Sequence, residues 1–499
     1  MNPLKKLAGE TAIYGVSSIL GRLLNWLLVP LYTNIFVESE YGIVTNLMAY
    51  VAMALVILTY GLETGFFRYA NDEDCKSNVF STTFLSVTTT SLLFLLGVFL
   101  FLDPISSFLN VEDRSIYIIL LSLTLAFDAI TSLPFAKLRQ ENRPLRYAFI
   151  KLSNIGINLG LNLFFLVLCP MVNGWFPEWG VTRIWNPEIG IGYIFIAMFV
   201  ASFFNLILLV PDLLKVKWQF DMTLLRKVLK YASPILVVSI AAQINLNVDK
   251  MLMPKLISDA GEALAQTGIY GANFKLAVIM TLFIQAFRFA FEPFFFSQKK
   301  DESSKQLYAD ILKYFVVFGL LIFLGVIFYL DIVKILIGPK FHDGLDIVPI
   351  VLLANFFLGI FFSLSLWYKL TDNTRFGAYI ALGGAAVTLI LNLILVPRIG
   401  YYGAATAILV CSVLMTVTSY ILGQKYYPIP YELKRIVTYF GFAMLLYFAS
   451  TYIQLENHWL KMLTKTPLII LFLVLVIRKE NLWSVIRGWG VKRRVKDKG

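Results

Sequence analysis

The sequence predicts an all-α polytopic membrane protein, and three properties of its composition indicate this class. Of the 499 residues, 58% are hydrophobic, and the mean hydropathy is +0.74. Charged residues make up only 15% of the chain, whereas soluble domains contain roughly 25%. A soluble protein of this length would need more polar residues to cover its surface. The composition therefore excludes a cytosolic enzyme, a secreted domain and a disordered chain.

Apolar stretches long enough to cross a bilayer divide the chain into fourteen predicted transmembrane helices. A hydrocarbon core about 30 Å thick needs roughly 20 such residues per helix. The predicted spans are residues 11–36, 40–66, 78–102, 115–137, 146–170, 189–213, 231–254, 266–296, 306–330, 346–369, 376–396, 402–423, 433–453 and 458–477. The first is too long for a signal-peptide core, so we interpret it as a helix that stays in the membrane.

The distribution of Lys and Arg predicts the orientation of these helices. With the N-terminus inside, 31 of the 43 basic residues fall in predicted cytoplasmic segments and 8 in external loops. Such an excess follows the positive-inside rule and predicts an N-in/C-in topology with an even number of helices. The net charge of +12 is then a property of cytoplasmic loops, and no nucleic-acid partner is expected. The basic tail is expected to contact lipid headgroups.

Several kinds of chemistry lack their usual sequence signals. The three cysteines, Cys75, Cys169 and Cys411, are far apart, and the two histidines, His342 and His458, lie in short connecting segments. We therefore expect no disulfide framework, metal site or cofactor. No glycine-rich loop followed by Lys-Ser/Thr is present, so an ATP-driven pump is excluded within this chain. The longest external loop, residues 170–189, has no catalytic constellation, and no enzymatic activity is expected.

One short pattern occurs twice, six predicted spans apart. Residues 41–43 (YGI) open the second span, and residues 268–270 (GIY) open the eighth. Each follows a short polar external loop and precedes a long apolar helix. Either the match is chance, or helices 1–6 and 7–12 are two bundles of the same topology, as in transporters that bind their substrate between repeats.

Four segments of the chain follow one another in a distinctive order. They are LVPLYT (28–33) leading to EYG (40–42), FD (220–221) with LKYASP (229–234), DK (249–250) with GIY (268–270) and KL (275–276), and NLILVPRIGYYGAA (392–405). In this order and spacing, and over essentially the whole chain, the sequence resembles the polysaccharide flippases of the multidrug/oligosaccharidyl-lipid/polysaccharide exporter superfamily.

The resemblance implies an N-terminal lobe (residues 1–214) and a C-terminal lobe (215–424) of six helices each around a central cavity. Residues 425–499 then form helices 13 and 14 and the basic cytoplasmic tail. The implied function is the transfer of polyprenyl-pyrophosphate-linked oligosaccharide to the external leaflet of a bacterial cytoplasmic (inner) membrane by alternating access. The product would serve lipopolysaccharide or another surface polysaccharide. Lipid-linked oligosaccharide and membrane lipids are the expected partners, with functional coupling to a polysaccharide polymerase, and the chain is expected to be monomeric.

Deep cations are candidates for binding the pyrophosphate. A charge such as Arg22, near the middle of helix 1, costs about 2.5–3.5 kcal/mol in the bilayer, and Asn25 shares its face. Arg22 either pairs with Asp128 of helix 4 or binds a substrate phosphate. Because flippases of this family use cavity cations on helices 1 and 8, the resemblance implies a role for Arg22, Arg288 and Lys275.

Two of these cations have alternative interpretations. Arg288 and Glu292 are four residues apart on helix 8, so Arg288 either pairs with Glu292 or binds substrate, and Lys275 either lines the cavity or extends to the lipid headgroups. Gln285 shares the face of Arg288. On helix 7, Gln243, Asn247 and Lys250 share a face. We expect these helix 7 residues and Gln285 to line the substrate cavity.

Helix 5 carries a polar stripe of Lys151, Asn154, Asn158 and Asn162, flanked by Gly156 and Gly160. Small residues at this spacing allow helices to approach closely, and amides can join them. Close helix packing therefore explains this stripe at least as well as a cavity does.

Three carboxylates, Glu63, Asp128 and Asp249, are candidates either for a coupling ion or for ion pairs. For Glu63, the favoured alternative is a pair with Arg68 at the cytoplasmic edge. The membrane potential alone could also drive export of an anionic lipid, by about 2.3 kcal/mol per charge per 100 mV.

Two other functions were weighed against the flippase. A membrane-embedded glycosyltransferase or polymerase would act on the same lipid carrier, but it needs catalytic groups that the short external loops do not present. A cation-coupled drug exporter of the same superfamily would have twelve helices and acidic cavities. Fourteen predicted helices and several intramembrane cations argue against that exporter.

Overall fold

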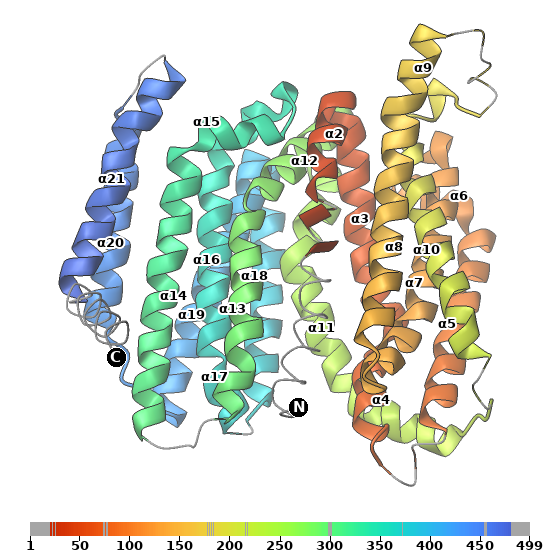
Figure 1. Cartoon of the computed structure of the whole chain (residues 1–499), viewed down its shortest axis with the longest axis horizontal. Helices are drawn as coiled ribbons and strands as arrows, with labels where there is room; N and C mark the ends of the chain where they lie inside the picture. The colour runs from red at the N-terminus through yellow and green to blue at the C-terminus, as the bar shows by residue number, and fades with distance from the viewer. Residues whose placement is uncertain are drawn as a thin grey trace, which may run out of the picture. The chain divides into compact units, whose positions relative to one another are not determined.

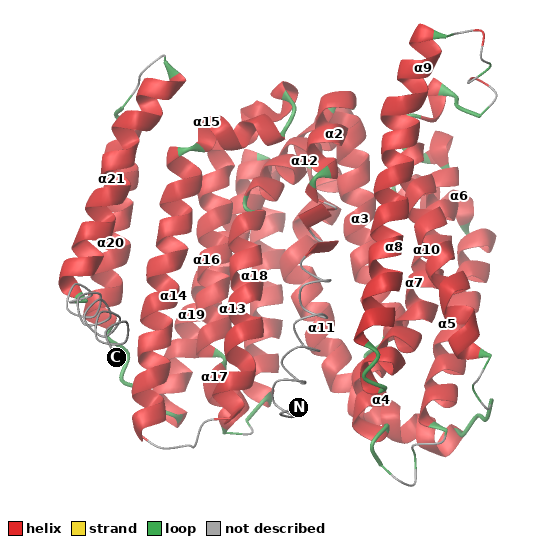
Figure 2. Ribbon diagram, in the orientation of Figure 1, coloured by secondary structure: helices red, strands yellow, loops and turns green. Residues whose placement is uncertain are grey.

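The computed structural model describes residues 20–480, with gaps at residues 22, 25, 73–74, 76–77, 177, 179, 181, 183, 215, 217, 298–301, 372 and 454–456. Side chains at 290, 292–297, 302–303 and 458–459 are also outside the description. The described residues form helices joined by short loops, with no strand among them (Figure 2). The all-α prediction is therefore confirmed.

Helices long and apolar enough to cross a membrane number eleven in the described residues. A bent pair, Ala260–Leu276 with Val278–Phe289, would make twelve if its 47° bend lies within one span. A helix occupies each predicted span from residues 40–66 onward. Residues 11–19, 22 and 25 of the first span lie outside the described residues, and α2 (Leu28–Ile35) forms the end of that span. The total of fourteen and the N-in/C-in topology remain predictions.

Contacts divide the chain into two compact units, which are described separately. Unit 1 contains residues 1–275, 337–343 and 381–407, and unit 2 contains the remainder. The elements that fall largely in unit 1 are α2 (Leu28–Ile35), α3 (Glu38–Thr59), α4 (Leu62–Tyr69), α5 (Val79–Leu100), α6 (Leu102–Phe108), η1 (Glu112–Arg114), α7 (Ile116–Gln140), α8 (Pro144–Leu163), the π-helical η2 (Phe164–Leu168), α9 (Cys169–Trp175), η5 (Pro187–Ile189), α10 (Gly192–Leu213), α11 (Met222–Leu256) and α12 (Ala260–Leu276).

Local chemistry sets several of these helix ends. Pro144 stands at the first position of α8, where a missing N–H costs nothing. Asp221 caps α11 by accepting hydrogen bonds from the amides of Thr223 and Leu224, at 2.8 and 3.0 Å. Between α3 and α4 the backbone turns through Tyr60 and Gly61, both with positive φ. The predicted span 40–66 is therefore one candidate span that consists of two helices.

Within unit 1, α7 packs against α3, α5, α8 and α10, and α11 packs against α3 (Figure 1). Buried Leu62, Phe66, Val87 and Leu133 belong to the apolar core shared by α4, α5 and α7. A polar contact joins α3 to α11, because the Asn46 side-chain amide donates to the Lys250 carbonyl at 2.7 Å. A cavity remains among α3, α4, α7, α8 and α10.

The elements largely in unit 2 are α13 (Val278–Ser297), α14 (Glu302–Phe328), α15 (Leu330–Val333), η6 (Lys334–Leu336), α16 (Val348–Leu364), α17 (Leu366–Leu370), α20 (Leu433–Thr451) and α21 (His458–Lys479). Three further elements, η7 (Pro339–Ile347), α18 (Arg375–Ile399) and α19 (Tyr401–Tyr426), contribute residues to both units. In unit 2, α14 packs against α16, α20 and α21.

The three cysteines form no disulfide with one another, and all are buried. Cys75 lies before α5, Cys169 begins α9, and Cys411 lies in α19, where its Sγ approaches the Met415 Sδ at 3.7 Å. Each therefore behaves as a small apolar side chain of the interior.

Candidate functional site

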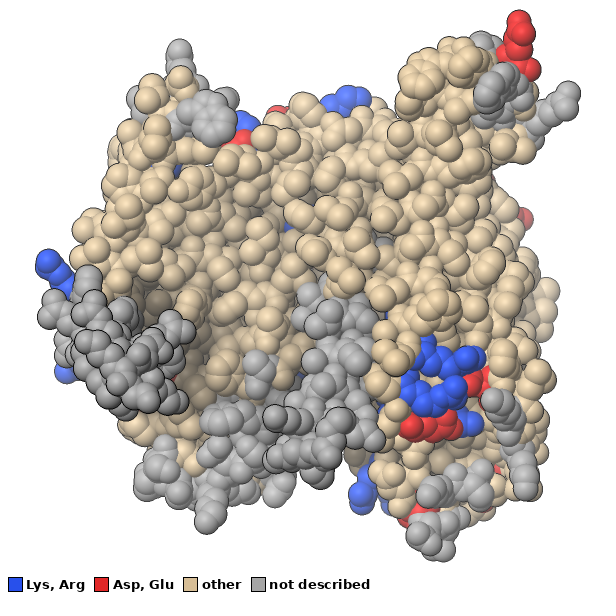
Figure 3. Space-filling model, viewed as in Figure 1, with Lys and Arg blue, Asp and Glu red and all other residues tan. Residues whose placement is uncertain are grey.

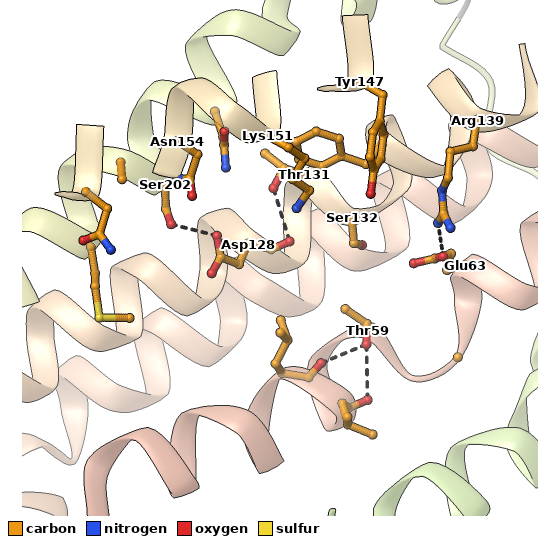
Figure 4. A pocket seen from close by; sticks show the side chains of 18 residues that line it. Thr59, Glu63, Asp128, Thr131, Ser132, Arg139, Tyr147, Lys151, Asn154 and Ser202 are labelled. Carbon is orange, nitrogen blue, oxygen red and sulfur yellow. Dashed lines mark hydrogen bonds and ion pairs between the residues drawn. The ribbon is translucent and has the colours of Figure 1, made fainter. Parts of the chain in front are cut away.

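A polar cavity of about 630 Å³ lies inside unit 1. Its walls come from α3, α4, α7, α8 and α10, which all belong to membrane-spanning segments. Charged and amide side chains among its lining residues are Glu63, Asp128, Arg139, Lys151, Asn154, Asn158 and Asn205. Figure 4 shows Lys151, Asp128 and Ser202 directed into the same space, with Glu63 and Arg139 at one end of it. A chamber of this polarity among apolar helices needs a functional explanation.

The polar stripe of α8 faces this cavity. Lys151, Asn154 and Asn158, at spacings of three and four residues, all line it. Only Asn162 serves packing, because the Tyr32 hydroxyl donates to its Oδ1 at 2.9 Å and the residue is fully buried.

The interpretation of the neighbouring glycines as a close-packing motif was wrong. Among the described residues, no atom lies within 4 Å of the position that a Cβ on Gly156 or Gly160 would take. These two glycines therefore do not bring another described helix close to α8. The cavity, and not close helix packing, explains the polar stripe of this helix.

Asp128 and Lys151 are the charged groups in the middle of the cavity. Asp128 accepts a hydrogen bond from the Ser202 hydroxyl at 2.7 Å. The Lys151 ammonium lies 4.1 Å from the centre of the Phe135 ring, and the structure gives it no ion pair among the described residues. Arg22 and Asn25 lie outside the described residues, so the pair of Arg22 with Asp128 stays a prediction.

At one end of the cavity, Glu63 forms an ion pair with Arg139. The sequence pointed to Arg68 as the partner of Glu63, and the structure corrects this. Arg139 is 76 positions away on α7, so sequence spacing could not identify it. The Arg139 guanidinium also lies over the Phe67 ring, 5.1 Å from its centre.

Two buried polar atoms on the cavity wall have no hydrogen-bond partner among the described residues. They are the Oδ1 of Asn205, a residue that is only 4% exposed, and the Nε of Arg139. An unpaired buried group costs about 1–3 kcal/mol. Neither residue was among the site residues predicted from the sequence. Ser202 and Asn205 lie three positions apart in the largely apolar α10, and this spacing indicates a polar face on that helix.

Next to the Glu63–Arg139 end, charged side chains gather into a patch near the lower ends of α4 and α8 (Figure 3). Asp212, largely buried, receives hydrogen bonds from Arg143 at 2.8 Å and from Arg146 at 2.7 Å. The hydrogen bond to Asp212 raises the pKa of Arg143 above its usual value. These pairs hold the end of α8 against α10.

The polar residues of α11 are engaged with protein partners. The Lys250 ammonium lies 3.2 Å from Asp249 Oδ1 and 2.8 Å from the Leu246 carbonyl. The Tyr270 hydroxyl donates to Asp249 Oδ2 at 2.5 Å, and both charged residues are buried. Asp249 therefore forms an ion pair with Lys250. A role for Asp249 in binding a coupling ion, and for Lys250 in substrate binding, remains a prediction.

Other predicted site residues are spread through the chain. The Asn247 amide donates to Gln243 Oε1 at 2.7 Å. Lys275 is exposed, at the end of unit 1, and its carbonyl accepts from the Trp26 indole at 2.9 Å. In unit 2, Gln285 is half-buried and the Arg288 guanidinium lies 4.6 Å from the centre of the Phe362 ring.

Within the described residues, no group of three or more His, Cys, Asp or Glu side chains is arranged to hold a metal ion. The side chain of Glu292 is outside the description, so its pair with Arg288 stays a prediction.

Comparison with solved structures identifies the fold. Lipid II flippase MurJ, in an inward closed conformation, matches with a TM-score of 0.69 at 15% identity, covering 93% of this chain and 98% of MurJ. An inward-facing multidrug resistance transporter of the MATE family, MOP superfamily, matches with a TM-score of 0.63 at 11% identity, covering 81% of this chain and 94% of the transporter. At these identities the likeness is one of fold.

Comparison with curated proteins gave no match. The family model described as polysaccharide biosynthesis protein matches residues 7–299, more than half of the chain. This match covers every wall of the polar cavity. The chain belongs to the polysaccharide biosynthesis protein family, in the fold of the MOP superfamily transporters.

Proposed function

We propose that this protein is a flippase for polyprenyl-pyrophosphate-linked oligosaccharide. It moves this lipid from the cytoplasmic to the external leaflet of the bacterial cytoplasmic membrane by alternating access, for synthesis of lipopolysaccharide or another surface polysaccharide. One observation carries the proposal: a chain of the polysaccharide biosynthesis family holds a polar cavity of about 630 Å³ within its membrane-spanning helices. A fold shared with the lipid II flippase MurJ supports it.

The transported lipid has three parts that need different surroundings. Its sugars need a hydrophilic chamber, its pyrophosphate needs cations, and its prenyl tail stays in the hydrocarbon. We assign the pyrophosphate to Arg22, Lys275 and Arg288, because a cation deep in a membrane protein is costly unless it meets an anion. The potential across a negative-inside membrane favours outward movement of the anionic lipid. The chain acts as a monomer in this proposal, and a polysaccharide polymerase receives its product.

The test uses the full chain in liposomes that contain a fluorescent polyprenyl-pyrophosphate trisaccharide. A membrane-impermeant quencher reports the rate at which the lipid crosses. We expect rapid crossing with the wild type and at least a tenfold slower rate with Arg22→Ala. Lys255→Ala is the matched control, because Lys255 is an exposed lysine whose ammonium contacts Phe108 and does not line the cavity.

Three outcomes would change the proposal. Crossing no faster than in protein-free liposomes would contradict the flippase. Crossing that survives Arg22→Ala would keep the flippase and make Arg22 a structural residue. Lengthening or transfer of the sugar chain, without crossing, would instead indicate a membrane-embedded enzyme.

A further inference from the structure

We propose that the polar cavity of unit 1 is a sugar subsite that binds uncharged sugar residues of the transported lipid, while its pyrophosphate is bound outside this cavity. The inference rests on the proposed function, and it assigns a role to Asn205 and Lys151. Three properties of the cavity support it: its unpaired atoms, its charge balance and its size.

The unpaired atoms favour a ligand that both donates and accepts hydrogen bonds. The buried Asn205 Oδ1 needs a donor, and the buried Arg139 Nε needs an acceptor. The Lys151 ammonium adds a donor: it lies over the Phe135 ring, and the structure gives it no hydrogen bond or ion pair among the described residues. A phosphate group has acceptor oxygens but nothing to donate to Asn205. Sugar hydroxyls satisfy both kinds of atom.

The charges of the described residues that line the cavity balance. Lys151 and Arg139 carry two positive charges, and Asp128 and Glu63 carry two negative charges. Arg139 and Glu63 neutralise each other directly. The remaining pair offers no excess positive charge for a pyrophosphate, and the Lys151 ammonium repels a metal cation. An uncharged polar ligand fits this arrangement best.

The size of the cavity fits more than one sugar ring. Its volume of about 630 Å³ lies within the range of roughly 300–1,000 Å³ that is typical of small-molecule sites. Leu55, Val56 and Met198 contribute apolar surface between the polar groups, which suits the C–H faces of sugar rings. A pyrophosphate alone would leave most of this space empty.

The experiment compares two lipids on the purified full chain in detergent. One is polyprenyl pyrophosphate without sugar, and the other is the same lipid carrying a neutral trisaccharide. Dissociation constants are measured for the wild type, Asn205→Leu and Lys151→Gln. We expect each variant to bind the trisaccharide lipid about tenfold more weakly than the wild type, and to bind the bare carrier within twofold of it.

Asn392→Leu is the matched control. Asn392 is also fully buried in unit 1 with an unpaired Oδ1, but it does not line the cavity. We expect it to leave the ratio of the two dissociation constants unchanged. Because this ratio compares two ligands on one variant, a general loss of folded protein does not alter it. If Asn205→Leu does not fold, the ratio of the two dissociation constants is taken from Lys151→Gln instead.

Two results would overturn the subsite. Equal weakening of both lipids would place the pyrophosphate in this cavity, and unchanged binding of the trisaccharide lipid in both variants would exclude the sugar. In either case, the proposed function stands if the wild type still carries the trisaccharide lipid across the liposome membrane. A wild type that neither binds nor transports that lipid contradicts both.

Discussion

Gly42 of α3 and Gly268 of α12 pack against each other through their backbones. A Cβ on Gly268 would lie 1.9 Å from the Glu38 carbonyl oxygen and 2.9 Å from the Gly42 amide nitrogen. A Cβ on Gly42 would lie 1.9 Å from the Leu264 carbonyl oxygen. These are the two glycines of the short pattern that occurs twice in the sequence. The repeated glycine thus marks a crossing where two helices touch without side chains between them.

We predict that Gly268→Ala destabilises the protein by at least about 2 kcal/mol, because backbone atoms cannot move aside as a flexible side chain can. The midpoint of thermal unfolding in detergent measures the effect. Gly97→Ala in α5 is the control, since no described atom lies within 4 Å of the added methyl group. That change should be neutral or stabilising by up to about 1 kcal/mol. Equal stability of both variants would contradict the crossing.

Lys313 of α14 joins this helix to α20 and α21. Its ammonium lies 3.0 Å from Glu480 and 3.1 Å from each of Glu432 and Asp310, and the Lys313 and Glu480 side chains are 5% and 4% exposed. Burial alone would raise the pKa of Glu480, but hydrogen bonds from Tyr439 and Lys313 lower it. The cluster therefore holds the buried Glu480 carboxylate ionised beside Lys313.

Replacing Lys313 by Met should cost about 3 kcal/mol, because it removes the buried ammonium beside the buried Glu480 carboxylate and leaves only the more exposed Arg435 to pair with it. Thermal unfolding of the purified chain measures this loss. Lys434→Met, at an exposed position of α20, should stay within about 0.5 kcal/mol of the wild type. A loss no larger for Lys313→Met than for Lys434→Met would show that the cluster contributes little.

Tyr270→Phe should destabilise the protein by about 1–3 kcal/mol, because Asp249 would lose a buried hydrogen-bond donor. In Asp249→Asn the same hydroxyl has a weaker acceptor, so the double variant should lose less than the sum of the single variants. Tyr452→Phe, at a side chain that is 87% exposed, serves as control. Strictly additive losses would argue against the bond between Tyr270 and Asp249.

The ion pairs of Asp331, in the short helix α15, predict that stability depends on pH. Burial alone would raise its pKa, but hydrogen bonds from Lys334 at 2.8 Å and Lys461 at 3.1 Å lower the pKa of this carboxyl to about 2. An unfolded Asp titrates at about 3.9. The stabilisation is therefore complete above that value and is lost as the pH falls toward 2.

Asp331→Asn should consequently cost about 1–2 kcal/mol at pH 7, and its difference from the wild type should shrink below about pH 4. Unfolding midpoints at pH 7, 5, 4 and 3 measure this. Asp113→Asn, at an exposed residue of η1 for which the structure gives no ion pair, should show no such trend. A difference that stays constant from pH 7 to pH 3 would contradict the ion pairs of Asp331.

The helical spans were predictable because apolar length alone identifies them, whereas the neighbours of each polar face were not. The spacing of Lys151, Asn154 and Asn158 predicts that they share a face of α8. Only the packing of α7 and α10 decides that this face meets a cavity rather than another helix. The partner of Glu63 likewise depends on a helix far away in sequence.

The break after α3 depended on backbone conformation rather than on hydropathy. Tyr60 and Gly61 adopt positive φ, and Gly61 is suited to this conformation, yet apolar residues such as Leu58 and Leu62 lie on both sides of the break. A hydropathy window therefore sees one long span where the chain forms two helices.

The burial of Cys75, Cys169 and Cys411 makes the natural protein a nearly silent background for thiol labelling. A cysteine placed at an exposed position, such as Asp113 or Glu188, would react with a membrane-impermeant maleimide far faster than these interior thiols do. Labelling of intact cells and of inverted vesicles then reports directly which loops face which compartment. The topology of the whole chain becomes accessible one residue at a time, without first removing any native cysteine.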